Sequence, residues 1–222
     1  MSTEENIEPI VSQIHDYWLD INNRELWIHG VDVSGVGYDG DEPGVDYLMA
    51  NMVIKNLHIL RKHSKTKPVK IHLNTCGGAY EEGMAIYDAI KMMPYKVMMI
   101  NYTHAQSMSS IIFQSADVRI MLPHSYFMFH YGTLGVGPAE NKSVYSTIDF
   151  CKTFDECMLD IYVDKVRKAK KFKGWTKKKI RKFLNEEMEK KADVYLNAEE
   201  TVAWGFADKV LYNWEDVFSV KI

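Results

Sequence analysis

The chain has 222 residues, which is enough for one α/β domain with a substantial core. Hydrophobic residues make up 46% and charged residues 26%, an ordinary globular composition that argues against a disordered chain or a coiled coil. The net charge of −3 hides a basic block at 165–182, which holds eleven Lys or Arg and no acid. We interpret this block as a solvated helix end or a subunit contact, with an anionic partner as the alternative. Nucleic acid is not an expected partner, because no nucleic-acid-binding motif accompanies the charge.

The N-terminus and the cysteines predict a cytoplasmic protein. Residues 1–5 are polar and acidic, where a secretory signal would be basic and then apolar. No apolar run approaches the roughly 20 residues of a membrane span, so no membrane association is expected. The three cysteines have no metal-binding spacing and predict reduced thiols: Cys76, Cys151 and Cys157. Neither a metal nor a cofactor is expected.

Short β-like runs alternate with helical stretches in the first half, which is typical of an α/β fold. The insert at 31–46 is rich in Gly and acids, but its spacing fits no EF-hand loop, so calcium binding is not expected. The expected elements are a weak helix at 7–20, a strand at 25–29, the insert, a helix at 47–61, and a strand at 69–73 that leads to the turn Gly77-Gly78.

The second half continues the pattern and then changes. A helix at about 81–93 ends at Pro94, followed by a strand at 97–102, a helix from Ser107 to about 115, and strands at 118–120 and 126–129. After His130, a Gly-rich extended stretch at 132–138 leads into a long helix whose apolar spacing runs from Val144 to Val166. Such an arm either meets a partner subunit or packs on its own domain. No repeat or linker divides the chain, so we expect one domain over 1–222 with an N-terminal segment at about 1–23.

Four segments carry the groups of a nucleophilic hydrolase. They contain the Gly-Gly turn that ends at Gly78, the helix start at Ser107, the strand end at His130, and Asp193. A serine needs a base within hydrogen-bond reach and donors for the oxyanion it creates, and a helix start and a glycine turn both supply backbone N–H groups. Each residue also has a structural alternative: a helix cap, a core histidine, a helix end or a turn glycine.

Taken together, these segments resemble the Clp protease proteolytic subunit (ClpP) family, serine peptidases of the ClpP/crotonase-like fold. That fold implies repeated strand-turn-helix units with a projecting strand-helix arm after residue 131. The resemblance covers roughly residues 15–212. The family's motif Ile-Asn-Ser-Pro-Gly-Gly falls on 73–78, Gly-Met-(Ala/Ser)-Ile-Tyr-Asp on 83–88, Ala-Ser-Met-Gly on 106–109, Leu-Pro-Asn-Ser-x-x-Met-x-His on 122–130, and the motif that begins Asp-x-Phe-Leu-Ser-Ala on 193–208.

The resemblance implies a role for each matching residue. Ser107 would be the nucleophile and His130 the general base, while Asp193 would orient the imidazole. The backbone N–H groups of Gly78 and Met108 would form the oxyanion hole.

Two other histidines and three substitutions qualify this assignment. His104 is a weaker substitute for the base, and His124 occupies a position where the family has Asn. Three positions depart from the family pattern near the nucleophile and the glycine turn: Cys76 stands in place of Pro, Gln106 in place of a small residue, and Ser109 in place of Gly.

The implied function is that of a serine endopeptidase that hydrolyses peptide bonds through an acyl-enzyme on Ser107. Its substrates would be peptides or unfolded proteins. A homo-oligomer of stacked rings, of which a tetradecamer is one form, would assemble through the arm at about 132–170. An AAA+ unfoldase is an implied partner that would use the ATP. The alternatives are a catalytically silent assembly or regulatory subunit and a crotonase-like acyl-CoA enzyme.

Overall fold

The computed structural model describes residues 8–30, 42–133, 135, 137, 138, 140–213, 215 and 216. Within them an eight-stranded sheet runs in the order β1-β2-β3-β4-β5-β8, and β6 branches from β4 and pairs with β7. The strands are β1 Leu19–Asp20, β2 Glu25–His29, β3 Val69–Thr75, β4 Val97–Gln106, β5 Val118–Met121, β6 Tyr126–Phe129, β7 Val194–Asn197 and β8 Lys209–Val210.

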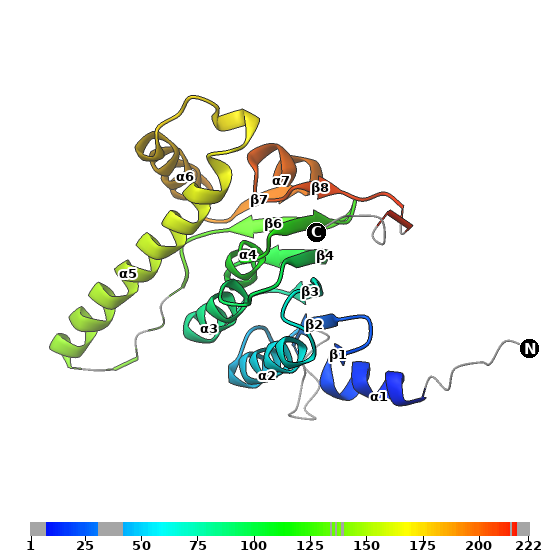
Figure 1. The fold of residues 1–222 in the computed structure, drawn as a ribbon. Coiled ribbons are helices and arrows are strands. Elements are labelled where there is room, and N and C mark those ends of the chain that lie inside the picture. The colour runs from blue at the N-terminus through cyan, green and yellow to red at the C-terminus, as the bar shows by residue number, and fades with distance from the viewer. Residues whose placement is uncertain are drawn as a thin grey trace, which may run out of the picture.

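Helices cover one face of this sheet and extend beyond it (Figure 1). Helices α2, α3 and α4 lie in a row beside the strands, and α5 projects away from the sheet. None of the described helices is both long and apolar enough to cross a bilayer. The helices are α1 Glu8–Tyr17, α2 Tyr47–His63, α3 Tyr80–Lys91, α4 Met108–Phe113, α5 Asn141–Val166, the 3₁₀ turn η1 Lys170–Phe172, α6 Lys177–Lys191 and α7 Ala198–Trp204.

The central strands repeat one strand-helix unit, and this repetition positions the site. Strands β2, β3, β4 and β5 are mutually parallel neighbours, and a helix follows each of β2, β3 and β4. Parallel strands end at the same edge of a sheet, so the segments that follow β3 and β4 lie next to each other. The turn Gly77-Gly78 and the serine at 107 are those two segments.

Several element boundaries differ from the sequence-based expectation. The N-terminal helix ends at Tyr17 rather than at residue 20, because Trp18 has a φ of +56° and the next two residues pair with β2 as an antiparallel strand. Strand β4 extends beyond 102 to Gln106, since pairing with β3 resumes after an irregularity in register. Residues 31–41 of the expected insert lie outside the described residues.

The arm after residue 131 consists mainly of α5. Its inner end is buried at Met158, Tyr162 and Val166, whereas Tyr145 and Phe150 near its outer end are exposed. The described residues between β6 and α5 form no strand within the single chain. Helix α5 projects away from the sheet (Figure 1). The exposed aromatic side chains therefore lie on the projecting part of the chain.

The basic block at 165–182 covers the end of α5, η1 and the start of α6. Part of its charge binds acids on α5: Arg181 pairs with Glu156 at 2.7 Å and also with Asp160, and Lys177 pairs with Asp164 at 2.6 Å. These ion pairs join α6 to α5. This contact within the chain is a role that the sequence-based interpretation of the block did not include.

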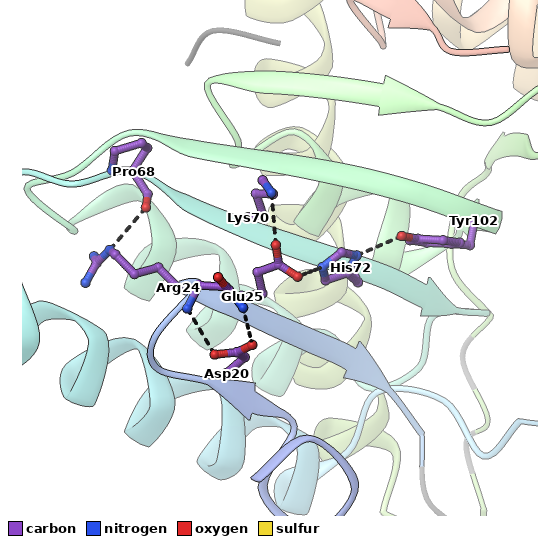
Figure 2. A network of polar contacts seen from close by, with 8 residues as sticks. Asp20, Arg24, Glu25, Pro68, Lys70, His72 and Tyr102 are labelled. Carbon is purple, nitrogen blue, oxygen red and sulfur yellow. Dashed lines mark hydrogen bonds and ion pairs between the residues drawn. The ribbon is translucent and has the colours of Figure 1, made fainter. Parts of the chain in front are cut away.

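A polar network pins β2, β3 and β4 together (Figure 2). The carboxylate of Glu25 accepts hydrogen bonds from Lys70 Nζ at 2.9 Å and from His72 Nε2 at 3.1 Å. With Nε2 donating, the His72 Nδ1 atom of a neutral ring accepts from the Tyr102 hydroxyl at 2.8 Å. Burial by itself raises the pKa of Glu25, but the bonds from His72 and Lys70 outweigh burial and hold that pKa below its ordinary value.

Candidate active site

Ser107 occupies a sharp turn between a strand and a helix. It follows β4, precedes α4, and has φ +50° and ψ −127°, a conformation that a residue with a side chain rarely adopts. The surrounding bonds hold it there: its N–H donates to Met128 O at 3.0 Å, and its carbonyl accepts from the Ser110 backbone at 3.0 Å and the Ser110 hydroxyl at 2.6 Å. Backbone strain of this kind persists where neighbours fix the geometry, and it is common at catalytic sites.

The sheet register places His130 and Asp193 beside this turn. His130 directly follows β6, which pairs with β4 near Gln106, and Asp193 directly precedes β7, which pairs with β6. The His130 Nε2 atom lies 2.8 Å from Ser107 Oγ, and its Nδ1 atom lies 2.9 Å from Asp193 Oδ1. An ionised carboxylate only accepts hydrogen bonds, so Nδ1–H donates to Asp193 and Nε2 accepts from the serine hydroxyl. The three side chains therefore form one continuous hydrogen-bonded row.

The glycine turn after β3 lies against the same serine. A Cβ atom added to Gly77 would lie 2.7 Å from Ser107 Cβ and 2.9 Å from Met108 N, and one added to Gly78 would lie 2.4 Å from both N and O of Val45. Their φ values of +103° and +146° also favour glycine. Only residues without a side chain fit the turn between these neighbours.

The expected oxyanion donors are the backbone N–H groups of Gly78 and Met108. The Val45 N–H donates to Gly77 O at 2.5 Å, and because a trans peptide places its C=O and N–H on opposite sides, the Gly78 N–H points away from Val45. Met108 opens α4, where the first N–H groups have no partner within the helix and lie at its positive end. Gly78, Ser107 and Met108 all line one cavity.

That cavity has a volume of about 610 Å³ and lies between α3, α4 and the arm helix α5. Apolar and aromatic residues form much of its lining, and among them Tyr80 stacks on Phe154 with ring centroids 3.8 Å apart. Asp155 also lines the cavity, and burial together with neighbouring Glu156 raises its pKa. The cavity has room for an apolar side chain of a substrate bound next to Ser107.

The substituted residue Ser109 and its neighbour Ser110 both support the turn. Ser109 is buried, and its hydroxyl donates to Thr75 O at 2.6 Å and accepts from Gln106 N at 2.9 Å, so it faces the interior instead of the cavity. The Ser110 hydroxyl lies 2.6 Å from that of Tyr162, and burial raises the pKa of this tyrosine. Sequence reasoning missed both roles, because the partners are distant in sequence.

Neither alternative histidine lines the cavity. His104 lies on β4 with its ring against Tyr126, 5.6 Å between centroids, and burial lowers its pKa. His124 lies in the turn between β5 and β6. In the part of the chain that the structure describes, no group of three or more His, Cys, Asp or Glu residues is arranged to hold a metal ion.

Comparison with known proteins agrees with this architecture. A family model described as Clp protease matches residues 42–213. The ATP-dependent Clp protease proteolytic subunit 2 of Pseudomonas aeruginosa is 32% identical over 179 residues, which cover 78% of this chain and 80% of that protein. The ATP-dependent Clp protease proteolytic subunit of Streptococcus suis is 31% identical over 169 residues, which cover 74% and 79% of the two chains.

A solved structure shows the same fold. The structure of a ClpP1 mutant from Listeria monocytogenes superposes with a TM-score of 0.64 and 21% identity, covering 88% of this chain and 95% of the other. The ClpP/crotonase-like fold expected from the sequence is confirmed. The chain belongs to the Clp protease family.

Proposed function

We propose that the chain is a serine endopeptidase that hydrolyses peptide bonds through an acyl-enzyme on Ser107. The observation that carries the proposal is the hydrogen-bonded row from Ser107 Oγ to His130, 2.8 Å, and from His130 to Asp193, 2.9 Å, at the wall of the cavity. A hydroxyl becomes an effective nucleophile only with such a base in reach.

In the acylation half of the reaction, His130 Nε2 takes the proton of Ser107 as Oγ attacks the scissile carbonyl carbon. The N–H groups of Gly78 and Met108 stabilise the oxyanion of the tetrahedral intermediate. His130 then gives its proton to the leaving amine nitrogen, and the C–N bond breaks.

In the deacylation half, water replaces the amine. His130 takes a proton from the water as it attacks the ester carbonyl, and returns the proton to Ser107 Oγ when the acid product leaves. Throughout both halves, Asp193 holds the Nδ1–H of His130 and stabilises the imidazolium.

The surroundings of Ser107 favour this proposal over a silent subunit. The side chain of Ser109 faces the interior and fixes the turn, so it does not obstruct the serine. The complete Ser-His-Asp row also favours hydrolysis over crotonase-like acyl-CoA chemistry, which has no need of an activated serine.

The proposal includes assembly and a partner. The exposed aromatic residues on α5, Tyr145 and Phe150, would be buried in a homo-oligomer of stacked rings, a tetradecamer being one form. The relatives from Pseudomonas aeruginosa and Streptococcus suis are named as subunits of an ATP-dependent protease. By analogy we infer that an AAA+ unfoldase delivers unfolded protein to this chain in the cytoplasm.

A fluorophosphonate probe tests the catalytic assignment. The wild type should become labelled on Ser107. Ser107→Ala should not be labelled, and its turnover should fall by on the order of a thousandfold or more. Ser143→Ala, in the exposed first turn of α5, is the control and should label normally. An unlabelled wild type, or equal labelling of Ser107→Ala, would refute the assignment.

A further inference from the structure

Glu42 joins the ends of two neighbouring strands at the glycine turn. Its Oε1 atom accepts from Gly30 N at 2.7 Å, and its Oε2 atom accepts from Cys76 N at 2.7 Å. Gly30 directly follows β2 and Cys76 directly follows β3, just beyond the last paired residues of the two strands. One carboxylate thus binds two backbone N–H groups that lie just beyond the ends of the paired strands. Hydrogen bonds to a charged acceptor are among the stronger ones in proteins.

Residues 42–45, here named the strap, continue along the turn after Glu42. Val45 N donates to Gly77 O at 2.5 Å, and Val45 O accepts from Ala79 N at 2.9 Å. Val45 and Gly78 form a parallel β-bridge. With the Glu42 contact to Cys76, the strap binds three backbone groups of the turn, which belong to Cys76, Gly77 and Ala79. These contacts fix the plane of the peptide that joins Gly77 to Gly78.

This peptide plane sets the direction of the Gly78 N–H, the group assigned above to the oxyanion hole. We infer that Glu42 is a positioning residue of that hole, acting through the strap and the turn and not by touching substrate. The inference rests on the proposed function. Glu42 is absent from the residues that line the cavity, so its effect on catalysis passes through Cys76, Gly77 and Gly78.

The glycines around the strap fit this role. A Cβ atom added to Gly30 would lie 2.5 Å from Glu42 Oε1, and one added to Gly44 would lie 2.4 Å from Gly77 O. Gly44 also has a φ of +84°. Glycine at positions 30 and 44 therefore leaves room where the strap contacts its neighbours. A side chain at position 30 would displace the Glu42 carboxylate from the two N–H groups that it binds.

Steady-state kinetics of a fluorogenic peptide provide the test. Glu42→Gln keeps the size of the side chain but retains only one acceptor oxygen, so one of the two contacts is lost. We expect kcat to fall about 10- to 100-fold, less than the about 100- to 1,000-fold cost of deleting an oxyanion donor outright. KM should stay within about twofold, since the lost stabilisation belongs to the transition state. The rate of fluorophosphonate labelling should fall in parallel.

A matched control and a second variant complete the design. The control is Asp46→Asn, which changes the next acid along the chain. Asp46 caps α2 by accepting a hydrogen bond from Met49 N at 2.8 Å. Because asparagine caps a helix equally well, kcat should not change. Gly30→Ala should cause a similar loss of kcat, because the added methyl group displaces the Glu42 carboxylate. The double variant of Gly30 and Glu42 should lose no more than the larger single loss, because both changes break the same contacts.

Thermal unfolding of each variant separates positioning from stability. A folded Glu42→Gln with wild-type kcat, or a loss matched by the unfolded fraction, overturns the positioning role while the peptidase assignment stands. If Glu42→Gln does not fold, a folded Gly30→Ala decides the matter by the same criterion. An inactive, unlabelled wild type refutes the proposed function itself.

Discussion

Replacing Gly78 by alanine tests the oxyanion turn directly. The added Cβ atom would lie 2.4 Å from both N and O of Val45, where real Cβ contacts under 3.0 Å essentially never occur. The neighbour is backbone, held by hydrogen bonds to Gly77 and Ala79, so it cannot rotate away as a flexible side chain would. The turn must therefore move by several tenths of an ångström or more, and the φ of +146° adds strain of about 1 to 3 kcal/mol for alanine.

The expected loss of activity follows from the tolerance of an oxyanion hole. Its donors act at about 2.7 to 3.1 Å from the oxygen, so a displacement of this size removes the Gly78 N–H from useful range. Loss of one such donor costs about 100- to 1,000-fold in kcat, which corresponds to about 3 to 4 kcal/mol of transition-state stabilisation. KM should change little, because α5 contributes more of the residues that line the proposed substrate cavity than the glycine turn does.

The assay compares kcat and KM for a fluorogenic peptide with thermal unfolding of the same samples. Gly132→Ala is the matched control: Gly132 lines the same cavity, yet a Cβ atom added to it has no neighbour within 4 Å. The control should keep wild-type kcat. A folded Gly78→Ala whose kcat lies within about threefold of the wild type would show that the Gly78 N–H does not stabilise the transition state.

Three further predictions address the base, the turn and the sheet. Asp193→Asn should lower kcat by on the order of 10,000-fold, measured on the same peptide, because an amide that donates to Nδ1 of His130 leaves that ring in the wrong tautomer. Ser109→Ala should lower the free energy of unfolding, measured in urea, by about 1 to 3 kcal/mol, because the buried Thr75 carbonyl loses the hydrogen bond from Ser109. An unchanged unfolding midpoint would contradict this. The lowered pKa of Glu25 means that its carboxylate stabilises the fold above the ordinary glutamate pKa, and that this stability is lost as the pH falls through the lowered value. Glu25→Gln should therefore flatten the acid limb of a plot of unfolding temperature against pH, and an unchanged limb would argue against the network in Figure 2.

The sequence predicted the elements that local pattern controls and missed those set by pairing. The helix expected at 47–61 is α2, and the strand expected at 69–73 is most of β3, because apolar spacing and flanking turns determine both. The strand expected at 97–102 was too short, since its last residues are held by partners on β3 and β6 that no local pattern reveals. The candidate catalytic residues Ser107, His130 and Asp193 were predicted from the family motif, and the sheet register explains why three residues so distant in sequence lie together.

The substitution of the family proline at position 76 gains a physical meaning from Glu42. A proline ring fixes φ and has no N–H, so a proline at this position would stiffen the turn by itself and could not bind a carboxylate. Cysteine frees the backbone torsion and supplies the N–H that Glu42 accepts at 2.7 Å. In the family motif the proline alone makes this position rigid. Here the contact between Cys76 and Glu42, which are 34 positions apart in sequence, takes the place of the proline. Cys76, which departs from the family pattern next to the glycine turn, therefore forms an interaction with Glu42 on the strap.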